Sequence, residues 1–223
     1  MNIKKAIRQW GLKHWGPRVR KQQMLKDKGA GIIGSITAFL EEEGVDCFLE
    51  FGTLLGMYRD RDFIKSDDDI DFGAWLRDAP VITRAMISHG YTLRREYHLI
   101  GGLGMEQTFR NSDGMNIDFF YYEPEGDHLV AYGFRKYQHY RRHKASFFKA
   151  SRYVFKPFSV SDAEFKGVRV KVPANTEEHI MEVYGPGYKV YDPHFKHGGN
   201  KTMYEFNESG FAGVGFRKGM PSK

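Results

Sequence analysis

The spacing of apolar residues along the chain changes between a helical and an extended period. Residues 30–43 carry apolar side chains at helical intervals, whereas residues 45–51 form an apolar run typical of a buried strand. Gly52 interrupts this run, and Thr53 can cap a short helix that ends near Arg59. These signals predict a helix, a buried strand and a second, short helix in succession.

A strand rich in acidic residues is predicted after the polar loop that follows. Side chains of an extended segment over residues 67–74 alternate between two faces, so Ile70 and Phe72 point into the core. Asp68 is expected to face away from the other acidic residues. The opposite face carries three carboxylates, those of Asp67, Asp69 and Asp71.

Clustered carboxylates need a compensating charge. Like charges about 4 Å apart repel by roughly 4 kcal/mol at an effective dielectric constant near 20, so the cluster must be solvated, partly protonated or neutralised. An acidic run can be a solvated loop, but Trp75 and the apolar residues within the segment favour a half-buried strand. We therefore predict a site for Mg²⁺, or alternatively Mn²⁺, with free positions for water and phosphate oxygens.

The rest of the chain alternates short strands with helices. Residues 111–114 read Asn-Ser-Asp-Gly and predict a hairpin turn between two strands. No internal repeat or low-complexity segment is evident. The further predicted elements are helices over residues 80–89 and 176–184 and strands over 91–100, 105–111, 115–122 and 165–172.

Composition narrows the class of protein. The chain has 223 residues with 41% hydrophobic content, enough for a sizeable core, and no apolar stretch of the roughly 20 residues that a membrane span needs. No secretory signal is recognisable, so a cytoplasmic location is expected. The single cysteine, Cys47, excludes an internal disulfide framework, argues against a structural zinc cluster, and is predicted to be a core residue.

Positive charge is concentrated at the N-terminus. The net charge is +6, and residues 1–28 hold nine Lys or Arg against one acidic residue, Asp27. We predict a basic amphipathic N-terminal arm over 1–28 and a single folded domain over 29–223. The arm could improve solubility, contact the anionic inner face of the cytoplasmic membrane, or bind nucleic acid, the last being the least favoured.

Several short segments together resemble the LicD and fukutin family, and the resemblance covers roughly residues 45–190. It implies an α/β (α+β) fold with a nucleotidyltransferase-like mixed β-sheet flanked by helices. It also implies transfer of phosphocholine, ribitol phosphate or a similar phospho-alcohol from a CDP-linked donor to a glycan hydroxyl, with release of CMP. The matching segments are Phe51–Arg59, Phe63-Ile64, Asp67–Asp71, Asn116–Phe120, Val172-Pro173 and Tyr184-Gly185.

The resemblance also assigns expected roles to individual residues. Gly52 and Thr53 match the start of the helix near the donor phosphates. Asp69 and Asp71 match the metal-binding pair, and Asp67 is expected to add a ligand or a water contact.

Three further residues are candidates from their positions. Asp118 shares a strand face with Asn116 and Phe120 and is the expected third metal-binding carboxylate. Because the acceptor hydroxyl must lose its proton, either Asp118 or Asp67 is expected to take it. Arg59 and Lys65 are candidate phosphate contacts, although each could equally be a solvated charge.

Three functions are compatible with these signals. The favoured one is the transfer of a phospho-alcohol to a lipopolysaccharide, capsule or teichoic-acid-like glycan, which could be lipid-linked. The same carboxylate geometry would serve a nucleotidyltransferase that places NMP on a small molecule or RNA and releases pyrophosphate. A noncatalytic nucleic-acid-binding protein is disfavoured because it leaves the acidic cluster unexplained.

Overall fold

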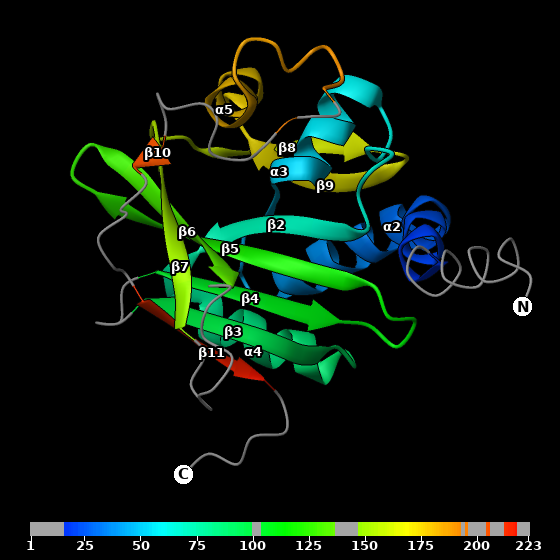
Figure 1. Cartoon of the computed structure of the whole chain (residues 1–223). Helices are drawn as coiled ribbons and strands as arrows, with labels where there is room; N and C mark the ends of the chain where they lie inside the picture. Colours follow the sequence, from blue (N-terminus) through cyan, green and yellow to red (C-terminus); the bar gives the residue numbers. More distant parts are fainter. Residues whose placement is uncertain are drawn as a thin grey trace, which may run out of the picture.

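The structure, a computed structural model, describes residues 16–99, 104–136, 147–192, 195, 204–205 and 212–217. Its centre is a mixed β-sheet with helices packed on one face and at one edge (Figure 1). This confirms the predicted α/β architecture. The strands of this sheet are β1 (Phe48–Leu49), β2 (Asp69–Trp75), β3 (Thr92–Leu99), β4 (Met105–Arg110), β5 (Asn116–Glu125), β6 (His128–Lys136), β7 (Phe147–Phe155), β10 (Tyr204–Glu205) and β11 (Ala212–Arg217).

The sheet has one parallel pair and a closed ring of strands. Strand order is β1-β2-β5-β4-β3-β11-β7-β10, and β6 pairs with both β5 and β7. Strands β5, β4, β3, β11, β7 and β6 therefore pair in a ring, with β2 and β1 extending from β5. Strands β2 and β5 pair in parallel, whereas the other pairs are antiparallel.

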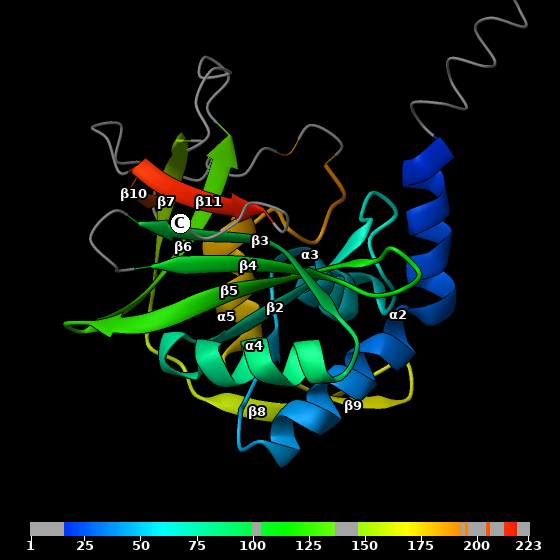
Figure 2. The same cartoon turned by 90° about the horizontal axis from the view of Figure 1, so that it is seen from below.

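Helices cover one face of the sheet and one of its edges. Helices α2 (Gly16–Glu42) and α4 (Ala79–Ser88) pack on the same face (Figure 2), where Ile70 of β2 and Ile117 of β5 have no exposed surface. Helices α3 (Phe51–Leu55) and α5 (Thr176–Tyr184) lie beyond the β2 edge (Figure 1). Two short helical turns span Gly56–Asp60 and Leu76–Asp78. The opposite face of β2 and β5 is thereby left for polar side chains.

Helix α2 begins earlier than predicted. It starts at Gly16 and continues through residue 28 without a break, although the periodicity placed the start at residue 30. The reason is that Leu25 is buried and Gly29 lies against the Phe63 ring, so the packed stripe extends into the basic segment. Residues 1–15 of the predicted arm lie outside the described residues, and a separate role for the arm remains a prediction.

A β-hairpin replaces the single strand predicted over residues 165–172. Strands β8 (Val160–Phe165) and β9 (Val168–Pro173) are antiparallel and are joined by Lys166 and Gly167. Both turn residues have positive φ, 52° and 80°, as a two-residue type I′ turn requires. The prediction was wrong because Ser161, Asp162 and Glu164 separate the two apolar residues of this segment, Val160 and Ala163, which are only partly buried, so the segment lacks a clear alternating signal.

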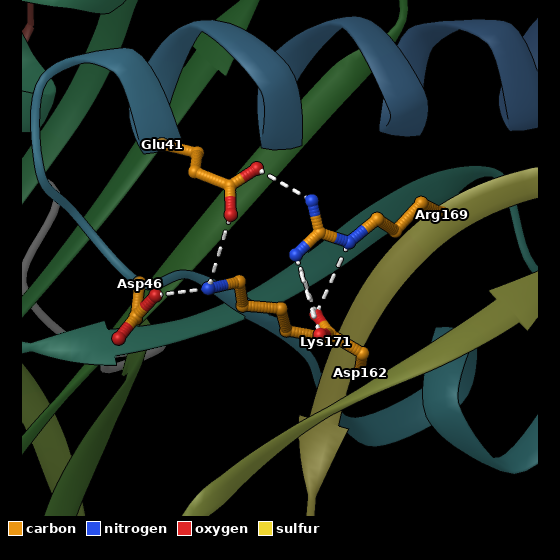
Figure 3. Close-up of polar contacts among 5 residues, drawn as sticks. All are labelled: Glu41, Asp46, Asp162, Arg169 and Lys171. Atoms are coloured by element: carbon orange, nitrogen blue, oxygen red, sulfur yellow. Dashed lines mark hydrogen bonds and ion pairs between the residues drawn. The ribbon is translucent and has the colours of Figure 1, made fainter.

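Ion pairs attach this hairpin to α2. Arg169 lies 3.1 Å from Asp162 and 3.2 Å from Glu41, and Lys171 pairs with Glu41 and Asp46 (Figure 3). Most of these side chains are partly exposed, so the network stabilises the contact only modestly. It links the C-terminal end of α2 to the hairpin, on the side of β1 away from the ring.

Several predicted elements are confirmed. Helix α5 has the predicted bounds, and the turn over 111–114 joins β4 to β5, with the Gly114 N–H donating to the Asn111 carbonyl at 3.1 Å. Cys47 is buried in the core. The strand predicted over 45–51 is shorter, because only Phe48–Leu49 pair with β2 before α3 begins at Phe51. No helix in the described part of the chain is long and apolar enough to cross a membrane.

Candidate active site

Three carboxylates meet where the parallel strands β2 and β5 pair. Asp71 is the register partner of Asp118, and Asp69 lies two residues earlier on the same face of β2. Each of the three offers an oxygen within 4.8 Å of the others. Their neighbours Ile70, Phe72 and Phe119 point into the core with no exposed surface, so alternation along both strands produces the cluster.

This carboxylate cluster is electrostatically strained. Burial, followed by the charge of Asp118, raises the pKa of Asp69 to about 7. Burial raises the pKa of Asp71 well above its ordinary value, with the charges of Asp69 and Asp118 adding to the rise. Burial also raises the pKa of Asp118. The three side chains therefore resist carrying full negative charge together.

The cluster fits a divalent cation. All three groups supply carboxylate oxygens, the ligands that Mg²⁺ and Mn²⁺ prefer. Asp118 Oδ1 is buried without a hydrogen-bond partner among the described residues, which a metal ligand would satisfy. Burying a carboxylate oxygen that has no partner costs free energy. The position of this oxygen therefore favours a role in binding a cation.

The first residues of α3 are hydrogen-bonded to both the side chain and the backbone of Asp71. The Gly52 N–H donates to Asp71 Oδ2 at 3.2 Å, and the Asp71 N–H donates to Thr53 Oγ1 at 3.0 Å. Thr53 was predicted to cap the helix, and this is wrong: the N-cap is Glu50, with no side-chain capping bond. Thr53 is buried beneath the cavity and positions Asp71 rather than facing a ligand.

Gly52 allows Asp67 to reach the cluster. Asp67 precedes β2, yet its carboxylate approaches Gly52 so closely that a Cβ atom there would lie 2.5 Å from Oδ2. Burial, followed by the charge of Asp68, raises the pKa of Asp67 to about 6. Asp67 thus joins Asp69 and Asp71 in lining one cavity, as their alternation predicts.

The cavity has a volume of about 610 Å³ and two kinds of lining residue, acidic and aromatic. Most of the carboxylates come from β2, β4, β5 and the loop before β2. The aromatic part of the lining, called the aromatic wall below, comes from the helices, β5, β6, β7 and the segment after α5. Its rings belong to Phe51, Phe120, Phe134, Tyr153, Tyr184, Tyr188, Tyr191 and Phe195.

The two basic candidates differ in position. Arg59 lines the cavity; its Nε and one Nη donate to Asp60 at 2.7 Å, and its other Nη donates to the Tyr188 carbonyl at 3.3 Å. Lys65 is exposed and does not line the cavity, although its neighbours Ile64 and Ser66 do. The structure therefore brings Arg59, but not Lys65, to the carboxylates.

Glu106 is a cavity residue that sequence reasoning missed. It lies on β4 with 8% of its surface exposed, and its Oε2 accepts a hydrogen bond from the Phe134 N–H at 2.8 Å. Burial, followed by the charge of Asp118, raises its pKa to about 8. Only the pairing of β4 with β5, which sets Thr108 opposite Asp118, reveals that Glu106 faces the same side.

Helix α2 also contributes positive charge that was not predicted. Lys21 Nζ lies 3.6 Å from Asp68 Oδ2, and an Arg18 guanidinium nitrogen donates to the Ser66 carbonyl at 2.9 Å. Asp68 is absent from the cavity lining, which confirms that it faces away. Two residues of the basic segment therefore lie beside the loop that carries Asp67.

Comparison with known proteins places this site within one family. Residues 44–175 match the family described as LicD/FKTN/FKRP, nucleotidyltransferase domain. The chain is 29% identical over 152 residues to the ribitol-5-phosphate transferase FKTN of Mus musculus, and the Homo sapiens protein of that name matches equally. These alignments cover 68% of this chain and 31% of each relative, so the chain spans about a third of their length.

A more distant similarity is to a solved structure. The crystal structure of the lincosamide antibiotic adenylyltransferase LnuA, with lincomycin bound, covers 71% of this chain and 86% of its own. The TM-score is 0.43 and the sequence identity 13%. Similarity at this level supports no functional conclusion.

Proposed function

The chain belongs to the LicD/FKTN/FKRP nucleotidyltransferase-domain family, and we propose that it transfers a phospho-alcohol, such as phosphocholine or ribitol phosphate, from a CDP-linked donor to a glycan hydroxyl. CMP is the leaving group. The observation that carries the proposal is the cluster of Asp69, Asp71 and Asp118, which lines a cavity of about 610 Å³ and lies within the matched segment. The relatives named ribitol-5-phosphate transferase support the class of donor.

Asp69, Asp71 and Asp118 would hold the metal ion. A bound Mg²⁺ or Mn²⁺ would supply Lewis-acid neutralisation of the charge on phosphate oxygens. The protein contributes preorganisation, since the Gly52 N–H binds the Asp71 carboxylate and the Thr53 hydroxyl holds the Asp71 backbone N–H.

The other cavity residues have complementary roles in this proposal. Arg59 lines the same cavity as the carboxylates and would supply a cation for the donor diphosphate. The aromatic rings offer stacking surfaces for the cytosine base. The donor would therefore lie with its phosphates over the carboxylates and its base on the aromatic side.

Transfer also requires removal of a proton from the acceptor. The acceptor oxygen forms a bond to the phosphorus that carries the alcohol, and the bond from that phosphorus to CMP breaks. Asp67 is the better proton acceptor because its pKa is raised to about 6, close to neutral pH, and Asp118 belongs to the group of three carboxylates that would hold the metal.

An assay of CMP release tests the proposal. The purified chain is incubated with Mg²⁺, candidate glycans and CDP-choline, CDP-ribitol or CDP-glycerol. We expect release that is donor-selective and acceptor-dependent, and that is lost in Asp69→Ala/Asp71→Ala but kept in Asp113→Ala, which changes an exposed turn residue. Turnover of NTP to pyrophosphate, with no CMP release from any donor, would instead establish the nucleotidyltransferase alternative.

The proposal also includes the kind of acceptor and the place in the cell where the reaction occurs. A lipopolysaccharide, capsule or teichoic-acid-like glycan, attached to lipid, would place the enzyme at the inner face of the cytoplasmic membrane. The surplus of Lys and Arg in residues 1–28 supports contact with anionic lipid. Sedimentation with anionic and neutral vesicles would measure this contact directly.

A further inference from the structure

A fully buried hydrogen bond joins α5 to the turn before α3. His179 Nε2 lies 2.9 and 3.0 Å from the two carboxylate oxygens of Glu50, and the two side chains are 1% and 0% exposed. Both oxygens lie within hydrogen-bond distance of this one ring nitrogen, so we assign the proton to Nε2, which donates it to the carboxylate. Neither residue lines the cavity, and the proposed chemistry uses neither of them.

Glu50 directly precedes a strained residue of the active site. Phe51 has φ of 40°, a left-handed conformation that is unfavourable for a non-glycine residue and persists only where its surroundings impose it. The Glu50 N–H donates to the Asp71 carbonyl at 3.1 Å, and the Gly52 N–H donates to the Asp71 carboxylate at 3.2 Å. The residues on both sides of Phe51 are thus bound to Asp71.

His179 is itself held in one orientation. Its ring stacks on Phe155, with the ring centroids 4.7 Å apart and an interplanar angle of 16°, and it makes an edge contact with Phe158 at 4.9 Å. Helix α5 then continues to Tyr184, which lines the aromatic wall of the cavity. The bond between His179 and Glu50 therefore connects that wall to the turn that contacts Asp71.

We propose that Glu50 and His179 are positioning residues for the active site. Their hydrogen bond holds Glu50, keeps Phe51 in its strained conformation, and directs the Gly52 N–H at the Asp71 carboxylate. Loss of the bond would let the turn relax and leave Asp71 less well oriented. The inference rests on the proposed metal-binding role of Asp71, but it does not depend on the identity of the donor.

Binding of Mn²⁺ to the whole chain, followed by electron paramagnetic resonance, tests this role without any substrate. His179→Phe keeps a stacking ring but removes the donor, and we expect it to weaken Mn²⁺ binding roughly tenfold, as loss of an orienting contact typically does. His179→Gln retains an N–H donor and should recover most of the affinity. If His179→Phe does not fold, Glu50→Met removes the acceptor instead and should cause the same loss.

A matched variant separates positioning from general stability. Glu182 is another buried acid of α5, and its carboxylate contacts the Lys156 N–H at 3.5 Å instead of the turn. Glu182→Ala removes a buried side chain and the acceptor of the Lys156 N–H, so it should lower the free energy of unfolding in urea but leave Mn²⁺ affinity unchanged. Equal affinity loss in Glu182→Ala, unchanged affinity in His179→Phe, or no Mn²⁺ binding by the unmodified chain would overturn the proposal. If the variants change Mn²⁺ affinity as expected but no donor yields CMP, only the proposed transferase activity is contradicted, and the positioning role stands.

Discussion

Asp71 and Asp118 lie directly opposite each other on the parallel strands β2 and β5, with both carboxylates directed to the cavity. Like charges on paired strands destabilise a sheet, and here burial strengthens the repulsion. The family match includes both residues. The arrangement is therefore best explained by a ligand that the charges serve, at the expense of the stability of the metal-free protein.

Asp118→Asn should raise the stability of the metal-free chain and lower its activity. The amide has the same shape without the charge, so the metal-free variant should be more stable than the parent chain by about 1–2 kcal/mol at pH 7.5. CMP release should fall by roughly a hundredfold or more. Urea unfolding and the transferase assay measure the two effects. An Asp113→Asn control should change neither by much, and a destabilised Asp118→Asn would contradict this account of the cluster.

The raised pKa values predict how stability depends on pH. Burial raises the pKa of Asp69 to about 7 and that of Asp67 to about 6, both above the ordinary value of 3.8. Between these values and 3.8 the folded state binds more protons than the unfolded state, so stability falls as pH rises. We expect the metal-free chain to lose on the order of 2–4 kcal/mol between pH 5 and pH 8.

Metal should remove most of this loss, because an ion that binds only the folded state stabilises it. Urea unfolding at several pH values, with EDTA or with 5–10 mM Mg²⁺ as roughly saturating conditions, measures both effects. A metal-free stability that rises or stays level between pH 5 and pH 8 would show that the carboxylates are solvated.

Local periodicity in the sequence was sufficient to predict part of the fold and part of the site. Alternation over residues 67–74 correctly placed Ile70 and Phe72 in the core and Asp69 and Asp71 on the other face. Helix α5 was predicted with its observed bounds. In these segments each residue's environment depends on its own strand or helix, so the sequence pattern carries the information.

Other features depend on contacts between distant segments. Glu106 reaches the cavity through the register of β4 with β5, and His179 meets Glu50 across 129 residues of sequence. Helix α2 also continues N-terminal of residue 30, where Gly29 lies against Phe63, a residue far away in the sequence. No local pattern encodes such pairings, because an isolated acid or histidine has the same signal whether it is exposed or buried.

Gly52→Ala should disable the site. A Cβ at this position would lie 2.5 Å from Asp67 Oδ2, so Asp67 or the turn must move. Because the Gly52 N–H also binds Asp71, we expect CMP release to fall at least roughly tenfold and Mn²⁺ binding to weaken. Gly31→Ala is the matched control: no atom would lie within 4 Å of its Cβ in α2, and alanine there should stabilise by about 0.5–1 kcal/mol. Full activity of Gly52→Ala would refute the close approach of Asp67.

Lys21 on α2 should tune the affinity of the carboxylate cluster for metal. Burial raises the pKa of Asp69 and of Asp118, and the positive charge of Lys21 opposes both rises, so it favours the ionised ligands. Removing the charge in Lys21→Gln should weaken Mn²⁺ binding roughly two- to fivefold at low ionic strength, and less in 0.5 M salt because screening, with a Debye length of only about 4 Å, then reduces the effect. The opposite result, stronger Mn²⁺ binding, would follow if Lys21 acted mainly by repelling the metal ion directly.

Arg20→Gln is the matched control. It makes the same change of charge at an exposed position on the helix and should have a smaller effect. Stronger binding by Lys21→Gln, or equal effects of the two substitutions, would show that the contribution of Lys21 is not the ionisation of Asp69 and Asp118.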